Sequence, residues 1–268
     1  YMGSCTIDNN TAVSGKGGGV FVLESGPVAN GSVNTYSGYD YLGVWNVISN
    51  NTAWSDGGGA YIAGRSRNFT TYTGTEQWHD YNVDHLIADW KFVGNRSLTG
   101  SGGGAYAMAP SLRNSYEQGP YLFGCSFQNN EAGNCGGGLY VTTGRLDACS
   151  FINNAATNQG GGAYIDGLQP LSASVGTNIW GVDPYPWMFV GMRPRAPEGM
   201  SNANHRVGGV SRCTFVGNWA GSDGGGIYVS GTNFNSRISV WGISNLANNV
   251  AETGSGGMLR GDVRVFAG

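Results

Sequence analysis

The sequence predicts an all-β fold, a parallel β-helix, on three observations. A glycine-rich phrase recurs along the chain, a second motif precedes each copy at a nearly fixed distance, and no segment shows a sustained helical period. The phrase is a run of glycines followed by a small or branched apolar residue and usually an aromatic residue. Its seven copies are Gly17–Phe21, Gly57–Tyr61, Gly102–Tyr106, Gly136–Tyr140, Gly160–Tyr164, Gly224–Tyr228 and the weaker Ser255–Leu259.

The second motif is an aliphatic or aromatic residue, two further residues and then an asparagine. This asparagine lies eight or nine residues before the last glycine of every copy, and a small residue follows two positions after it. The seven asparagines are Asn10, Asn51, Asn95, Asn130, Asn154, Asn218 and Asn249. We expect each amide to hydrogen-bond to the asparagine of the next layer, forming an asparagine ladder inside a tight corner where this residue adopts the left-handed conformation.

Each repeat is expected to supply two short strands. Apolar and polar residues alternate in segments such as Cys125–Phe127 and Cys149–Phe151, which is typical of a half-buried strand that ends at the ladder asparagine. The glycine-rich bend then opens a second strand, as in Ala60–Ile62 or Leu139–Val141. Such units bury their apolar faces only by stacking on copies of themselves, so the repeats predict a solenoid.

We therefore expect one domain spanning residues 1–268, a β-helix of about seven rungs. The shortest interval between copies, from Gly138 to Gly162, is 24 residues and suits one rung of a three-sided coil. Parallel crossover connections are overwhelmingly right-handed, which favours a right-handed coil.

Longer intervals place their extra residues after the glycine strand, so all insertions are expected to leave the coil from one edge. The insertions are residues 23–45, 63–90, 107–123, 167–210 and 230–243. Their aromatics could cover one face as a secondary core, form a protein interface or stack on sugar rings. The surface aromatic candidates are the tyrosines of an outward column beside the glycine bend and three tryptophans of the insertions. They are Tyr61, Tyr106, Tyr140, Tyr164, Tyr228, Trp78, Trp180 and Trp187.

Composition and charge argue against several functions. Only 12% of the residues are charged, the net charge is −3 and no Lys/Arg cluster occurs, so we expect no nucleic-acid partner. No apolar run is long enough to insert into a membrane.

Candidate chemistry is sparse. A glycosidase needs two facing carboxylates and a pectate-type lyase needs calcium-binding acids beside a base. The best local cluster is His79, Asp80, Asp84, His85 and Asp89, and Asp56 and Asp223 fit turn formers better than a site. We expect no catalytic residue, cofactor or metal, and no enzyme activity.

Four cysteines share one repeat position, two residues before the aromatic or aliphatic residue of the second motif. They are Cys5, Cys125, Cys149 and Cys213. Since strand side chains alternate between faces, these cysteines should be buried with that residue. Cys125 and Cys149 could form a disulfide between rungs, and inert buried thiols are the alternative.

Glycosylation sequons occur at five positions. Asn30 and Asn68 lie in insertions and are plausible acceptors, with Asn9 and Asn50 as further candidates. Asn95 also heads a sequon but is a ladder asparagine, so it should be the least accessible.

The paired motifs resemble those of a known family. Gly-Gly-Ala-Tyr-like and Phe-x-x-Asn-like segments, as in Gly103–Tyr106 and Phe127–Asn130, resemble the repeats of the polymorphic outer-membrane proteins and related autotransporter passengers. Similar repeats occur in secreted β-helix proteins, including surface proteins of algae and protists. The resemblance implies an extracellular or surface-exposed right-handed β-helix used for adhesion or structure.

The two ends of the chain suggest self-association. Neither end carries a polar or helical cap, and the half-rungs at Tyr1–Cys5 and Val265–Gly268 are complementary in phase. We expect an extracellular structural protein that stacks head to tail with itself into a filament or coat and carries covalent or bound glycans. The alternatives are a fragment of a longer β-helix, a carbohydrate-binding or polysaccharide-cleaving β-helix, and an adhesin passenger.

Overall fold

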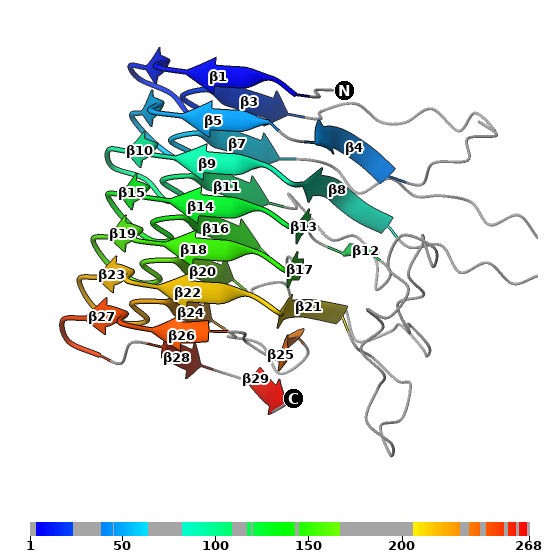
Figure 1. Cartoon of the computed structure of the whole chain (residues 1–268), viewed down its shortest axis with the longest axis vertical. Coiled ribbons are helices and arrows are strands. Elements are labelled where there is room, and N and C mark those ends of the chain that lie inside the picture. Colours follow the sequence, from blue (N-terminus) through cyan, green and yellow to red (C-terminus); the bar gives the residue numbers. More distant parts are fainter. Residues whose placement is uncertain are drawn as a thin grey trace, which may run out of the picture.

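The chain folds as stacked parallel sheets. The computed structural model describes residues 4–23, 39–44, 46–63, 82–108, 117–118, 120–142, 145–166, 206–230, 236–241, 245–254, 257–260 and 263–266. All elements in these ranges are β-strands, and they form four parallel sheets, called A to D below. Coils stack along the long axis from β1 (Thr6–Asp8) at one end to β29 (Val263–Phe266) at the other (Figure 1). The predicted all-β parallel β-helix is thus confirmed, and its handedness stays a prediction.

Sheets A and B flank the asparagine corner, and each has seven strands. Sheet A consists of β1, β5 (Val47–Ser49), β9 (Lys91–Val93), β14 (Ser126–Gln128), β18 (Ser150–Ile152), β22 (Thr214–Val216) and β26 (Asn245–Ala247). Sheet B consists of β2 (Thr11–Ala12), β6 (Thr52–Ala53), β10 (Arg96–Ser97), β15 (Glu131–Ala132), β19 (Ala155–Ala156), β23 (Trp219–Ala220) and β27 (Val250–Ala251).

Sheet C follows the glycine bend and also has seven strands. They are β3 (Val20–Leu23), β7 (Ala60–Ala63), β11 (Ala105–Met108), β16 (Leu139–Thr142), β20 (Ala163–Asp166), β24 (Ile227–Ser230) and β28 (Gly257–Arg260). The seventh copy corrects the sequence alignment by one residue, because Gly257 pairs with Ile227 rather than taking the place of Gly226. β28 therefore begins eight residues after its ladder asparagine, Asn249, whereas β24 begins nine residues after Asn218.

Sheet D is a fourth side that the sequence analysis did not predict. Its strands are β12 (Glu117–Gln118), β8 (Asn82–Ala88), β13 (Tyr121–Phe123), β17 (Arg145–Asp147), β21 (Arg206–Ser211), β25 (Ser236–Trp241) and β29, and β4 (Tyr39–Val44) pairs with β8. Most of these strands fall in the ranges assigned to insertions. The last part of each such insertion therefore rejoins the coil before the next sheet A strand begins.

The interior is built from columns of identical side chains. Phe92, Phe127, Phe151 and Phe215 are fully buried and stack ring on ring, with centroids 4.7, 4.8 and 4.7 Å apart. These spacings match the distance between neighbouring strands, because parallel in-register pairing places equal positions directly above one another. Apolar residues of sheets C and D complete the core.

The bend requires glycine because its backbone adopts a left-handed conformation and lies very close to the backbone of the next rung. Gly102 has a φ of +71°, a left-handed conformation that favours glycine. A Cβ on Gly103 would lie 2.3 Å from the carbonyl oxygen of Glu131 and 2.4 Å from that of Gly137. Any side chain at this position would force the next rung away.

The asparagine corner differs from the prediction in one respect. The left-handed residue is the one immediately before the ladder asparagine, as at Asn9, Asn50, Gly94, Asn129, Asn153, Gly217 and Asn248. None of the ladder asparagines has a positive φ. The ladder side chain is therefore aimed inward by a left-handed neighbour.

Candidate functional site

The asparagine ladder is the most continuous polar feature of the described residues. The backbone N–H and Nδ2 of Asn130 both donate to Oδ1 of Asn154, at 3.0 and 2.9 Å. Nδ2 of Asn130 also donates to the carbonyl oxygen of Phe92 at 2.9 Å. The same three bonds are made by Asn51, Asn95, Asn154 and Asn218. A buried amide that uses both its donors and its acceptor fixes the spacing of the rungs.

The two ends of this ladder are chemically different. At the first rung, Nδ2 of Asn10 donates to the carbonyl of Asp8 in its own rung at 3.0 Å, and its Oδ1 accepts no hydrogen bond from the described residues. At the last rung, Oδ1 of Asn249 accepts both bonds from Asn218, and Nδ2 donates to Phe215 O. Within the described ranges its backbone N–H finds no acceptor. One end thus offers an acceptor and the other offers donors.

The outward aromatic column of sheet C forms a second continuous stack. The ring centroids of Phe21, Tyr61, Tyr106, Tyr140, Tyr164 and Tyr228 are 5.3, 5.3, 4.6, 4.9 and 5.1 Å apart in that order. The prediction of surface aromatics is wrong for two members, since Tyr61 is only 7% exposed and Tyr228 only 5%. Tyr106, Tyr140 and Tyr164 are half-buried. The four inner rings, from Tyr61 to Tyr164, each stack between two neighbouring rings, which removes their faces from water.

Burial keeps these phenols protonated. Desolvation, with the Asp166 carboxylate second, raises the pKa of Tyr140 far above its ordinary value. Burial likewise raises the pKa of Tyr106, with the Asp56 charge as the second cause. It also raises the pKa of Tyr164 to about 12. Tyr106, Tyr140 and Tyr164 are therefore uncharged over the whole physiological pH range.

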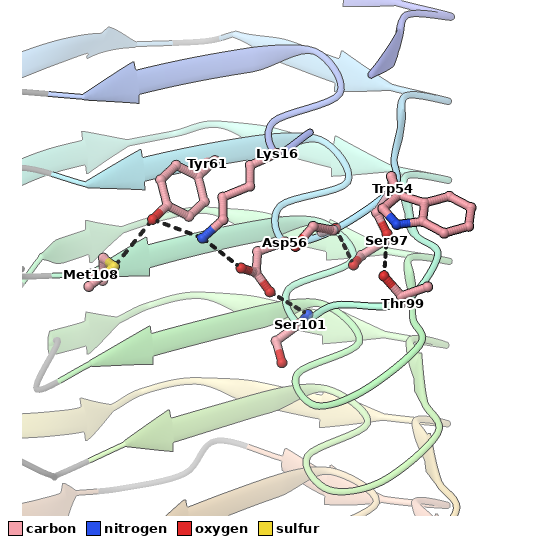
Figure 2. A network of polar contacts seen from close by, with 9 residues as sticks. Lys16, Trp54, Asp56, Tyr61, Ser97, Thr99, Ser101 and Met108 are labelled. Carbon is pink, nitrogen blue, oxygen red and sulfur yellow. Dashed lines mark hydrogen bonds and ion pairs between the residues drawn. The ribbon is translucent and has the colours of Figure 1, made fainter. Parts of the chain in front are cut away.

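A small network of polar contacts around the Lys16–Asp56 ion pair lies beside the aromatic column at its first rungs (Figure 2). Nζ of Lys16 lies 3.0 Å from Oδ2 of Asp56, donates to the Tyr61 hydroxyl at 3.3 Å and sits 4.5 Å from the centre of the Tyr61 ring. Oδ1 of Asp56 accepts the backbone N–H of Ser101 at 3.0 Å. Burial lowers the pKa of Lys16, but the hydrogen bonds to Asp56 and Tyr61 and the charges of these groups together outweigh burial and raise the pKa. The network braces three successive rungs.

The cysteine column lies in the interior. Cys125, Cys149 and Cys213 are buried, while Cys5 on the first rung is partly exposed. The possible Cys125–Cys149 disulfide is not formed, and both residues carry free thiols. Their Sγ atoms instead donate to the carbonyls of Ile87 and Leu122, at 3.3 and 3.5 Å. Burial raises the pKa of Cys125, as expected for an inert thiol.

An ion pair that the sequence analysis missed joins sheet D to the next corner. Nε and one terminal nitrogen of Arg212 donate to the two carboxylate oxygens of Asp147, at 2.9 and 2.7 Å. The Asp147 side chain is only 2% exposed. Asp147 lies two residues before Cys149 and Arg212 lies one residue before Cys213, so the aligned cysteines are the sequence signal that brings the pair close.

The remaining candidates are scattered. Asn9 and Asn50 are exposed in the left-handed corner column, whereas Asn95 is buried in the ladder. Several candidates lie outside the described residues, namely Asn30, Asn68, Trp78, Trp180, Trp187, His79 and Asp80. No group of three or more His, Cys, Asp or Glu side chains within the described part of the chain could hold a metal ion.

Two segments match a family model. Residues 124–142 and 212–230 each match the Chlamydia polymorphic membrane protein repeat. Both segments run from the corner before a sheet A strand, through the ladder asparagine and the glycine bend, to the tyrosine strand. The resemblance to the polymorphic outer-membrane protein repeats is confirmed in these two repeats. Proteins of that family are outer-membrane and surface proteins, which supports a surface location in general.

Other comparisons add nothing to this family resemblance. Comparison with curated proteins and with solved structures finds no match. Among the described residues, no helix has the length and hydropathy needed to cross a membrane.

Proposed function

We propose that this chain is an extracellular structural protein whose β-helical copies stack head to tail into a surface filament or coat. The carrying observation is the complementarity of the two ladder ends. Among the described residues, Asn10 has an unused Oδ1, and Asn249 has an unused backbone N–H and Nδ2 hydrogen. In this proposal the partner is a second copy of the chain, and the protein has no catalytic role.

A junction between copies would repeat bonds that already exist inside the coil. Asn249 of one copy would donate to Oδ1 of Asn10 in the next, as Asn218 donates to Asn249 at 3.0 and 2.8 Å. Nδ2 of Asn10 would move from Asp8 O to the carbonyl of Leu246, as Asn51 donates to Ile7 O at 3.0 Å. No new geometry is required, only continuation of the repeat.

The end rungs also expose apolar side chains at column positions. Phe21 and Leu23 are more than half exposed on the first rung, and Leu246 and Val250 are about half exposed on the last. Burying such surface favours association, and an open strand edge is a template for further pairing. Because the two ends are different surfaces, the contact is heterologous and produces a fibre rather than a closed dimer.

The proposal is tested on the purified chain by light scattering after size exclusion and by negative-stain microscopy. We expect concentration-dependent rods with an axial repeat of roughly 34 Å, since seven strands stack at about 4.8 Å each. A chain that stays monomeric at every accessible concentration overturns the proposal.

A matched pair of variants locates the contact. Thr11 pairs with Thr52, whose N–H donates to Asn10 O at 2.8 Å, so the N–H of Thr11 faces the open edge. Thr11→Pro removes that donor and should leave the chain monomeric, while Thr11→Val keeps it and should assemble. Equal assembly of both variants would rule out stacking through this edge.

The carbohydrate-binding and adhesin alternatives depend on the insertions, and nothing in the described ranges favours either.

A further inference from the structure

The tyrosines of sheet C form a continuous stack of nearly parallel rings. Five tyrosines follow one another with ring centroids no more than 5.3 Å apart and ring planes inclined by 14, 2, 4 and 18°. They lie on the face of sheet C opposite the core, which is lined by residues such as Ile62 and Val141. Adjacent rings at this separation allow an electron vacancy on one tyrosine to move to the next.

Tyr140 differs from Tyr61 in what its hydroxyl contacts. It donates to Oδ2 of Asp166 at 2.8 Å, a short charge-assisted bond, and Asp166 is only 8% exposed. The Tyr61 hydroxyl instead meets the Lys16 ammonium and the thioether of Met108. A phenol that loses an electron becomes a strong acid, so a carboxylate already bonded to its hydroxyl can take the proton without rearrangement.

We propose that Tyr140 is a one-electron oxidation site, that Asp166 is its proton acceptor, and that the stacked tyrosines deliver the oxidising equivalent to it. An external one-electron oxidant, such as an oxidising radical or a high-potential metal complex, removes one electron from the column and is itself reduced. The hydroxyl proton of Tyr140 moves to Oδ2 of Asp166, leaving a neutral tyrosyl radical and a neutral carboxylic acid. No bond between heavy atoms forms or breaks.

Such a column would react with oxidants in place of the oxidisable side chains of the interior. Cys125 and Cys149 carry free thiols in the core, and Met108 contacts the column through the Tyr61 hydroxyl. For a protein at a cell surface, an outer sink for oxidants protects side chains whose oxidation would disrupt the packed coil. This inference does not depend on head-to-tail stacking.

The test uses the full chain with photogenerated tris(bipyridine)ruthenium(III) as oxidant and electron paramagnetic resonance of freeze-trapped samples. We expect a tyrosyl signal in the unmodified protein and loss of most of it in Tyr140→Phe, which keeps the stacked ring. Asp166→Asn keeps the phenol but loses the proton acceptor, and should lose most of the signal as well. Thermal melts verify that each variant is folded.

Tyr121→Phe is the matched control, since Tyr121 lies on β13 of sheet D and not in the stacked column. We expect its signal to stay close to that of the unmodified protein. No tyrosyl signal in the unmodified chain, equal signals from it and Tyr140→Phe, or a loss in Tyr121→Phe equal to that in Tyr140→Phe would each overturn the proposal. If Asp166→Asn does not fold, the two tyrosine variants still decide the outcome.

Discussion

Two columns of asparagines run side by side along the corner between sheets A and B, one residue apart, and they play opposite roles. The ladder column, represented by Asn130, is buried and uses its amide in bonds between rungs. The corner column, represented by Asn129, is exposed and adopts a φ of +54°. The ladder column uses the hydrogen bonds of the asparagine side chain, whereas the corner column uses the ability of the asparagine backbone to adopt a positive φ.

The residue types that the seven repeats place in the two columns show what each column requires. The corner column has glycine at Gly94 and Gly217, which reach the same left-handed conformation with no side chain at all. The ladder column has asparagine in every rung. The corner therefore requires a conformation, and the ladder requires a side chain that is at once donor and acceptor.

The largest expected effect comes from breaking the ladder at its centre. Asn130→Ala removes the side-chain donor to Phe92 O, and it leaves the buried Asn95 backbone N–H and one Asn95 Nδ2 hydrogen without their acceptor. At roughly 1–3 kcal/mol for each unsatisfied group, we expect the free energy of unfolding to fall by about 3 kcal/mol or more. Urea denaturation measures it, and a loss below about 1 kcal/mol would contradict the assigned role.

A smaller loss is expected one residue earlier. Asn129→Ala keeps the exposed corner but places a residue that disfavours positive φ in the left-handed conformation. We expect a loss of about 1–2 kcal/mol in the free energy of unfolding, from backbone strain alone. The same denaturation experiment applies, and a loss as large as that of Asn130→Ala would mean that the Asn129 side chain also matters.

The smallest effect is expected for Asn129→Gly, which copies what Gly94 and Gly217 already do. Glycine adopts the left-handed conformation without strain and raises the entropy of the unfolded chain, so the net change should stay below about 1 kcal/mol. Comparing its denaturation midpoint with that of Asn129→Ala isolates the conformational requirement. If both variants lose the same stability, conformation does not explain the corner column.

The sequence predicted the features that repeat one residue type in every rung. The parallel coil, the glycine bend and the positions of Phe127 and Asn130 all follow from self-similarity, because stacked rungs place equal residues above one another. The fourth sheet was missed because its strands share no motif, as a comparison of Arg145–Asp147 with Arg206–Ser211 makes clear. Where side chains vary from rung to rung, periodicity carries no signal.

Other features could not be predicted from the sequence because they depend on which strands lie side by side in the folded coil. Asp147 and Arg212 are 65 positions apart, and their pairing follows from β17 lying beside β21. The identity of the left-handed residue was also misplaced by one position, since Asn precedes Asn in most corners and the sequence alone does not tell which one turns the chain.

The register of sheet C does not depend on the number of residues between its strands. Leu139 pairs with Ala163 and Ala163 pairs with Ile227, although the first interval is 24 residues and the second 64. Closing a flexible loop becomes harder only slowly with length, by about 0.6 kcal/mol for each doubling. A foreign peptide grafted between β20 and β21 should therefore be tolerated, which would make this coil a carrier for displaying sequences of widely different length at one edge.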